Sequence, residues 1–222
     1  MAQKYFGQDP IIAFLWGVLL VTGLTAMVLG RWPLGFVALA TFALATAPAI
    51  LASRLNIMLP VPFLAATTLF IFASVFLGEA FDFYERVWWW DLALHAASAI
   101  GFGLIGFLFI FMLFEGDRFA APPSALAFIA FCFAMTAGAM WEIFEYLMDL
   151  SFGLEMQKTG LDDTMSDLMI DGIGALVGAV SGFIYLKGSS IGLTTTLIGQ
   201  FVTLNRRLYH KSKERLRKDG KD

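Results

Sequence analysis

The stretch from Trp141 to Asp171 holds eight carboxylates in a chain that is otherwise strongly apolar. On a helix, Glu142, Glu145 and Asp149 recur at i, i+3 and i+7, so the three side chains share one face. A second acidic stripe with a spacing of four residues follows on the next predicted helix: Asp163, Asp167 and Asp171. Carboxylates at membrane depth are costly and are normally kept for ion pathways, proton relays or metal sites. We therefore expect this hairpin to carry the function.

A third group of polar side chains opens an earlier predicted helix. Asp91 and His95 are four residues apart, so a carboxylate and an imidazole point the same way at the start of this helix. Three consecutive tryptophans, residues 88–90, come just before them, and such amphipathic aromatics favour the membrane–water interface. Alternating topology brings this helix start to the same membrane face as the acidic hairpin.

An imidazole among carboxylates is a ligand set for a divalent ion such as iron, manganese, zinc or magnesium. The candidate metal ligands are Asp91, His95, Glu142, Glu145, Asp163 and Asp167, and the candidate catalytic groups are Glu142, Glu145 and Asp171. The alternative is a buried polar network in which neighbours such as Tyr84, Trp141 and Thr164 satisfy the carboxylates, some of them protonated. Clustered like charges without a cation repel strongly at low dielectric, which favours the metal.

Composition sets the fold class. The chain has 222 residues, of which 59% are hydrophobic and 15% charged, and this places it outside the soluble globular range. Six segments approach the roughly 20 apolar residues that a membrane span needs. They are Ile11 to Leu29, Leu34 to Ser53, Val61 to Gly78, Leu92 to Phe114, Ser124 to Leu147 and Leu168 to Leu186. We predict an all-α, polytopic transmembrane helix bundle of about six spans.

The bundle is expected to occupy residues 1–187, and residues 188–222 to form an interfacial helix near 194–204 and a cytoplasmic basic tail. Lys and Arg are concentrated in that tail, and basic residues are retained on the cytoplasmic side. We therefore expect both termini in the cytoplasm, the acidic cluster on the outer face, and a location in the bacterial inner membrane. The expected partners are membrane lipids, with no nucleic acid.

A family resemblance rests on several of these motifs. One part is Glu79, Tyr84 and Trp90-Asp91-x-x-x-His95, followed by Ser98-Ala99, Gly101 and Gly103. The other is Trp141-Glu142-x-x-Glu145, Asp163-Thr164-x-x-Asp167 and Asp171-Gly172-x-Gly174-Ala175. With these motifs, the segment from about Pro60 to Lys187 resembles the YjdF-type family of bacterial inner-membrane proteins. Its acidic hairpin is more distantly similar to that of VanZ-like membrane proteins. The resemblance implies the fold and the importance of the polar positions, and it supplies no reaction.

Three functions fit these observations. The first is a metal-dependent enzyme that acts on a lipid or lipid-linked substrate, with the acidic and His cluster as ligands and general acid or base. The second is an ion- or proton-coupled transporter that uses the carboxylates as cation sites, although the broken helices and inverted repeat of many carriers are not evident. The third is a membrane scaffold or assembly factor whose polar network locks the bundle.

Overall fold

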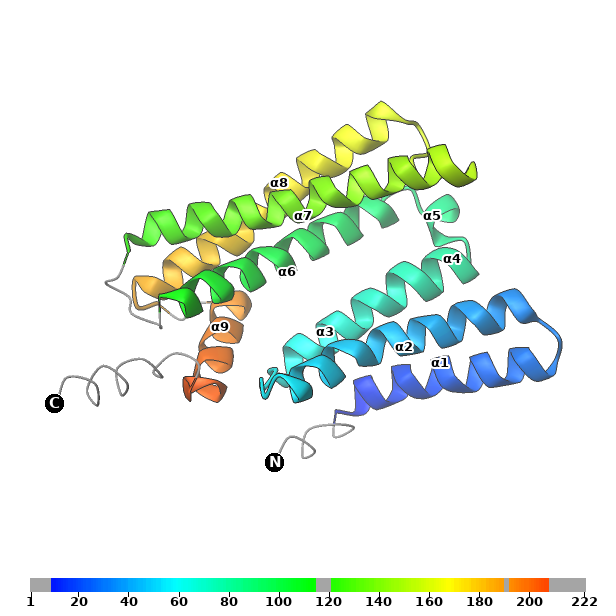
Figure 1. Cartoon of the computed structure of the whole chain (residues 1–222), viewed down its shortest axis with the longest axis horizontal. Coiled ribbons are helices and arrows are strands. Elements are labelled where there is room, and N and C mark those ends of the chain that lie inside the picture. Colours follow the sequence, from blue (N-terminus) through cyan, green and yellow to red (C-terminus); the bar gives the residue numbers. More distant parts are fainter. Residues whose placement is uncertain (1–8, 115–120, 190–191, 208–222) are drawn as a thin grey trace, which may run out of the picture. The chain divides into compact units, whose positions relative to one another are not determined.

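The computed structural model describes residues 9–114, 121–189 and 192–207, and these residues form helices and connecting turns, with no strand among them (Figure 1). Six of the helices in this part of the chain are long and apolar enough to cross a membrane. The predicted all-α membrane bundle is thereby confirmed. Contacts divide the chain into two compact units, Met1–Trp90 and Asp91–Asp222. The predicted basic tail lies largely outside the described residues.

The first unit opens with two antiparallel helices, α1 (Pro10–Val28) and α2 (Trp32–Arg54). Asp9 caps α1, because its carboxylate accepts the backbone N–H groups of Ile11 and Ile12 at 2.9 and 3.2 Å. The two helices approach closely at glycines: a Cβ on Gly23 would lie 2.7 Å from Leu39. Glycine at that contact allows the neighbouring side chain to pack against bare backbone.

The third span of this unit is not a uniform α-helix. It runs as α3 (Val61–Ile71), a π-helical segment η2 (Phe72–Leu77) and α4 (Gly78–Ala80), which together form one span from Val61 to Ala80. The short helix α5 (Phe83–Arg86) follows. Its Arg86 pairs with Asp82 at 3.3 Å, so this charge is engaged within the first unit.

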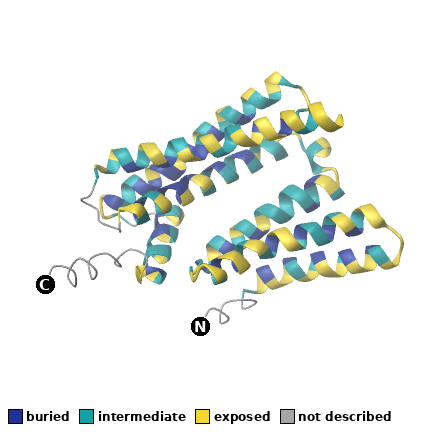
Figure 2. Cartoon of the chain, in the orientation of Figure 1, coloured by how far each residue is buried: buried dark blue, intermediate teal, exposed yellow. Residues whose placement is uncertain are grey.

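The described part of the second unit consists of three long helices and a short one. They are α6 (Trp90–Leu113), α7 (Pro123–Phe152), α8 (Leu161–Leu186) and α9 (Leu193–Leu204). In Figure 1, α6, α7 and α8 run alongside one another. Buried positions recur along each of them between exposed ones (Figure 2), as expected of helices with one packed face.

Small residues bring α6 and α8 together. A Cβ on Gly178 would lie 2.8 Å from the Gly103 Cα, and one on Gly174 would lie 2.7 Å from the Ala96 carbonyl oxygen. The small-x-x-x-small spacing of Gly174, Gly178 and Gly182 in the sequence indicates this close approach, and the structure confirms it. The backbone of α8 thereby lies directly against α6.

The C-terminal end of α6 is an apolar core. Phe107 and Phe111 are buried there with Leu126 of α7 and Ile198 of α9. The helix predicted near 194–204 is present as α9, and its Ile198 is fully buried. Its placement at a membrane interface stays a prediction.

The spans at the acidic hairpin are longer than expected. α7 continues to Phe152, five residues beyond Leu147, and α8 begins at Leu161, seven residues before Leu168. Hydropathy underestimates the length of both helices because the added turns carry carboxylates, which are strongly polar. Some of these carboxylates accept hydrogen bonds from the connecting segment. Asp149, for example, accepts the backbone N–H groups of Met156 and Gln157 at 2.8 and 2.9 Å.

Candidate metal centre

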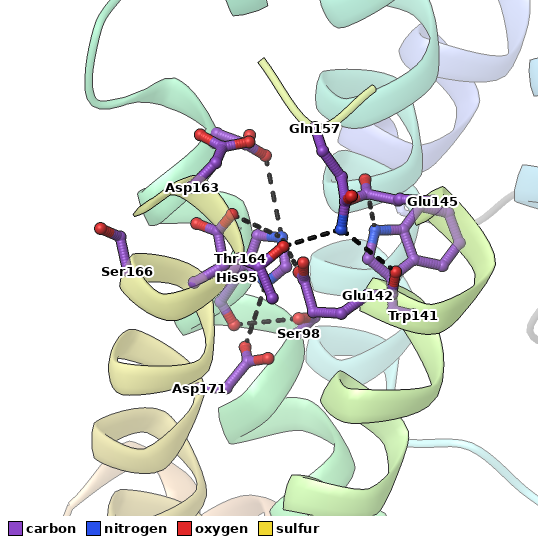
Figure 3. Close-up of polar contacts among 12 residues, drawn as sticks. His95, Ser98, Trp141, Glu142, Glu145, Gln157, Asp163, Thr164, Ser166 and Asp171 are labelled. Atoms are coloured by element: carbon purple, nitrogen blue, oxygen red, sulfur yellow. Dashed lines mark hydrogen bonds and ion pairs between the residues drawn. The ribbon is translucent and has the colours of Figure 1, made fainter. Parts of the chain in front are cut away.

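His95 lies at the centre of the polar end of the second unit (Figure 3). It is in the second turn of α6 and is only 6% exposed. Its Nδ1 is 3.2 Å from Oδ1 of Asp171 on α8, and Asp171 is 1% exposed. An ionised carboxylate can only accept a hydrogen bond, so Nδ1 donates to Asp171. In the neutral imidazole this contact leaves the lone pair on Nε2.

Three carboxylates surround that Nε2 atom. Oδ1 of Asp91 is 3.9 Å away, Oε1 of Glu142 3.8 Å and Oδ2 of Asp167 3.9 Å. The carboxylates come from α6, α7 and α8, so all three long helices contribute one. The predicted proximity of His95, Glu142 and Asp167 is confirmed.

These side chains form two sets with the spacing of metal ligands. His95, Glu142 and Asp167 form a fully buried set, and Asp91, Asp163 and Asp167 form a partly exposed one. In each set one ligand atom per residue lies within 4.8 Å of the others. An ion that binds N and O at about 2.0–2.2 Å holds its ligands at most about 4.4 Å apart, so a small inward movement would bring either set into coordination range. Asp167 belongs to both sets.

Several buried oxygens of the cluster lack a hydrogen-bond partner. Among the described residues, no group meets hydrogen-bonding geometry with either carboxylate oxygen of Glu142, with Oδ2 of Asp167 or with Oδ2 of Asp171. Glu142 is 4% exposed and Asp167 2%, so water reaches them little. Buried polar atoms are ordinarily paired, and an unpaired one calls for an explanation such as an ion. Thr164 and Gln157 interact through their side chains with the Glu142 carboxylate without reaching that geometry, so the predicted network leaves Oδ2 of Asp167 and Oδ2 of Asp171 unsatisfied.

The network does satisfy other acidic groups of the hairpin. Glu145 accepts the Trp141 indole N–H at 2.9 Å, and it belongs to neither ligand set. Gln157, in the segment between α7 and α8, donates from Nε2 to the Thr164 hydroxyl at 2.7 Å and to the Glu142 carbonyl at 3.4 Å. This contact holds the connecting segment against the end of the site (Figure 3).

Asp163 lies at the more exposed end of the cluster. Its Oδ2 accepts the Lys158 backbone N–H at 3.2 Å, so one of its oxygens is committed to the connecting segment. The six predicted metal ligands are thus placed as follows: five lie in the two sets, and Glu145 lies outside them, bonded to Trp141. Asp171, predicted to be catalytic, lies behind the imidazole.

Two residues that support the site were not predicted. Gly138 on α7 provides the space for Asp171, since a Cβ there would collide with that carboxylate, 2.8 Å from its Cγ. Gly138 precedes Glu142 by four residues, so its position on the same helix face is the signal that could have found it. Gln157 gave no comparable signal, because its role depends on how the connecting segment folds back.

Residues 10–188 match the family described as predicted membrane protein (DUF2238). The chain belongs to this family. The matched region contains every residue of both ligand sets. No solved structure matches this chain.

A curated relative of this DUF2238 chain is an uncharacterized protein of Thermotoga maritima, 34% identical over 112 residues. The match covers 49% of this chain and 57% of the relative, so it spans little more than half of the relative's length. These comparisons establish a membrane protein family. They do not support the distant resemblance to VanZ-like proteins.

Proposed function

We propose that the second unit binds a divalent metal ion through Nε2 of His95 and the carboxylates of Glu142 and Asp167. The observation that carries this proposal is the orientation of the imidazole. Asp171 occupies Nδ1 at 3.2 Å, while Nε2 faces carboxylate oxygens at 3.8–3.9 Å. A carboxylate behind a histidine that ligates a metal is the usual way to fix its tautomer and orientation.

Without a cation, this arrangement places an imidazole lone pair toward three carboxylates. A protonated imidazole would supply one positive charge against four nearby carboxylates: Asp91, Glu142, Asp167 and Asp171. Like charges repel strongly in a medium of low dielectric constant. A divalent ion offsets more of this charge, and the unpartnered Oδ2 of Asp167 would coordinate it.

The ligand chemistry favours a first-row ion such as Mn²⁺, Fe²⁺ or Zn²⁺. These ions accept imidazole nitrogen together with carboxylate oxygen, whereas Mg²⁺ and Ca²⁺ prefer oxygen alone. Such an ion acts as a Lewis acid toward a carbonyl or phosphoryl oxygen.

From this we propose a metal-dependent enzyme that acts on a lipid or lipid-linked substrate. The site lies where α6 and α8 begin and α7 ends, which is one end of three helices long enough to span the membrane. A substrate whose reacting group is at the lipid–water boundary could reach such a position. Glu145 is buried but outside both ligand sets, and we assign it the part of general acid or base.

Metal analysis of the purified protein tests the proposed function. The wild-type chain should retain a first-row metal in near-stoichiometric amount, and Glu142→Ala should lose it. Glu155→Ala is the matched control, because Glu155 is an exposed carboxylate of the nearby connecting segment. A wild-type protein that binds none of these metals after reloading would contradict the proposal.

We also propose that the family is the YjdF-type family of bacterial inner-membrane proteins, with both termini cytoplasmic and the metal site on the outer face. The concentration of Lys and Arg in the C-terminal tail supports this orientation. In a Cys132→Ser background, a cysteine at Lys158 should react with an impermeant thiol reagent on intact cells, and one at Lys213 should not. Equal labelling of the two positions would refute the orientation.

A further inference from the structure

We infer that the centre holds a second divalent cation, bound by Asp91, Asp163 and a bridging Asp167. This inference rests on the proposed metal site, since the two ions would share Asp167. The oxygens of the three carboxylates lie within 4.8 Å of one another, as close as the ligand atoms of the buried set. The second ion would lie toward the first turns of α6 and α8.

Asp167 is the residue that joins the two sets. It is 2% exposed, and its Oδ2 is buried without a hydrogen-bond partner among the described residues. A carboxylate has two oxygens and can bind one ion with each. Two-metal centres use such shared ligands to hold their ions about 3.5–4 Å apart. Oδ2 of Asp167 lies 3.9 Å from Nε2 of His95 and would bind the first ion, which leaves Oδ1 for the second, so this buried carboxylate is placed as a bridge.

Asp91 connects the sets from the other side. Its Oδ1 is 3.9 Å from Nε2 of His95, so this carboxylate borders the first site while it belongs to the second. Its side chain is 25% exposed, in contrast to the buried Glu142. The second set is thus the more accessible of the two, and an ion could enter the centre through it.

Formal charge also favours two cations. Five carboxylates lie in or against the two sets: Asp91, Glu142, Asp163, Asp167 and Asp171. One divalent ion and the Lys158 ammonium, which acts on Asp91, together offset three of these charges and leave two, whose repulsion is costly where the dielectric constant is low. A second ion offsets two more.

The ligand type distinguishes the two positions. The first set contains an imidazole nitrogen, whereas the second offers only carboxylate oxygen. An all-oxygen set suits hard ions such as Mg²⁺ or Mn²⁺. Mn²⁺ accepts both kinds of ligand, so it is the ion that can fill both positions in one preparation.

The test uses the full chain in detergent, stripped with a chelator, reloaded with Mn²⁺ and freed of unbound metal. The wild-type protein should hold about two Mn²⁺ ions per chain and show the electron paramagnetic resonance signal of a spin-coupled pair. Asp163→Asn should hold about one ion, with the signal of an isolated Mn²⁺. Asparagine keeps an oxygen that can accept the Lys158 N–H, so the connecting segment should stay in place.

Asp162→Asn is the matched control. Asp162 is the adjacent carboxylate in the first turn of α8, is exposed and belongs to neither set, so this variant should still hold about two ions. If Asp163→Asn does not fold, Asp91→Asn takes its place, and the wild-type signal alone still reports whether a coupled pair is present.

The outcomes separate the two proposals. A wild-type protein with about one ion and no spin coupling would overturn the second site and leave the first intact. Two ions retained in both Asp163→Asn and Asp91→Asn would overturn the assignment of ligands to the second site. No bound ion in the wild-type protein would overturn the second site together with the proposed function.

Discussion

Among the residues that the structure describes, each of the two units has three apolar spans, but the units differ in the polar side chains that they bury. Mean hydropathy is 2.0–2.3 for the spans of the first unit and 1.7–2.3 for those of the second. The buried polar residues described in the first unit are Thr41 and Thr68. The second unit buries a histidine and four carboxylates: His95, Glu142, Glu145, Asp167 and Asp171.

The difference shows that spans of similar hydropathy can differ in whether they bury ionisable side chains. Thr41 satisfies its hydroxyl locally by donating to the Val37 carbonyl at 2.7 Å, so it needs nothing from a neighbouring helix. A carboxylate has no proton to donate when ionised and must find a donor or a cation elsewhere. The second unit therefore depends on its three long helices to satisfy ionisable groups, whereas the two buried threonines described in the first unit are neutral, and of these only the Thr68 hydroxyl has no hydrogen-bond partner among the described residues.

Removal of metal should have the largest effect, because it should destabilise the second unit and leave the first unchanged. An ion that binds only the folded state stabilises it by about 4 kcal/mol at a thousandfold excess over Kd, so a chelator should lower Tm in detergent by roughly 10 °C. Hydrogen exchange should accelerate in α7 and α8 and remain unchanged in α1 and α2. Asp167→Asn should melt below the metal-loaded wild type and no longer respond to chelator.

The polar-network alternative predicts the opposite pair of results. There, a chelator has no effect, and Asp167→Asn is stabilising because it removes buried like-charge repulsion. These two results together would lead us to abandon the metal centre.

Loss of the carboxylate behind His95 should have a smaller effect. Asp171→Asn keeps the shape of the side chain next to Gly138 but removes the charge that orients the imidazole, so metal affinity should fall about 10–100-fold. Titration of the stripped protein with Zn²⁺ measures this change. Thr41→Ala, a buried polar position of the first unit, is the control and should leave the affinity unchanged. Equal affinities in all three proteins would contradict the assigned role of Asp171.

Two glycine substitutions should sharpen the comparison through packing alone. Gly178→Ala should destabilise the second unit by about 1–3 kcal/mol, since its Cβ would lie 2.8 Å from the Gly103 Cα. Gly17→Ala on α1 meets no atom within 4 Å and should stabilise the first unit by about 0.5–1 kcal/mol, the usual gain for alanine over glycine in a helix. Reversible unfolding in detergent measures both changes. Stabilisation by both substitutions would show that the α6–α8 contact at Gly178 is less close than described.

The sequence by itself determined the spans, because hydropathy over about 20 residues is a local property. It also placed the carboxylates on common helix faces, since spacings of three and four residues follow from helix geometry. The small-residue spacing of Gly174 and Gly178 likewise predicted a close helix contact. These features depend on neighbours within one helix, and they agree with the structure except at the end of α7 and the start of α8, which extend beyond the predicted spans.

Only the tertiary structure decided which partner each acidic side chain contacts. Glu142 and Glu145 share a face of α7, yet Glu142 meets His95 while Glu145 accepts the Trp141 indole. Asp167 and Asp171 share a face of α8, yet one faces Nε2 and the other Nδ1. These roles follow from the axial register of α6 against α7 and α8, which close contact at glycines sets. That register joins residues far apart in the chain, so no spacing within one helix could predict it.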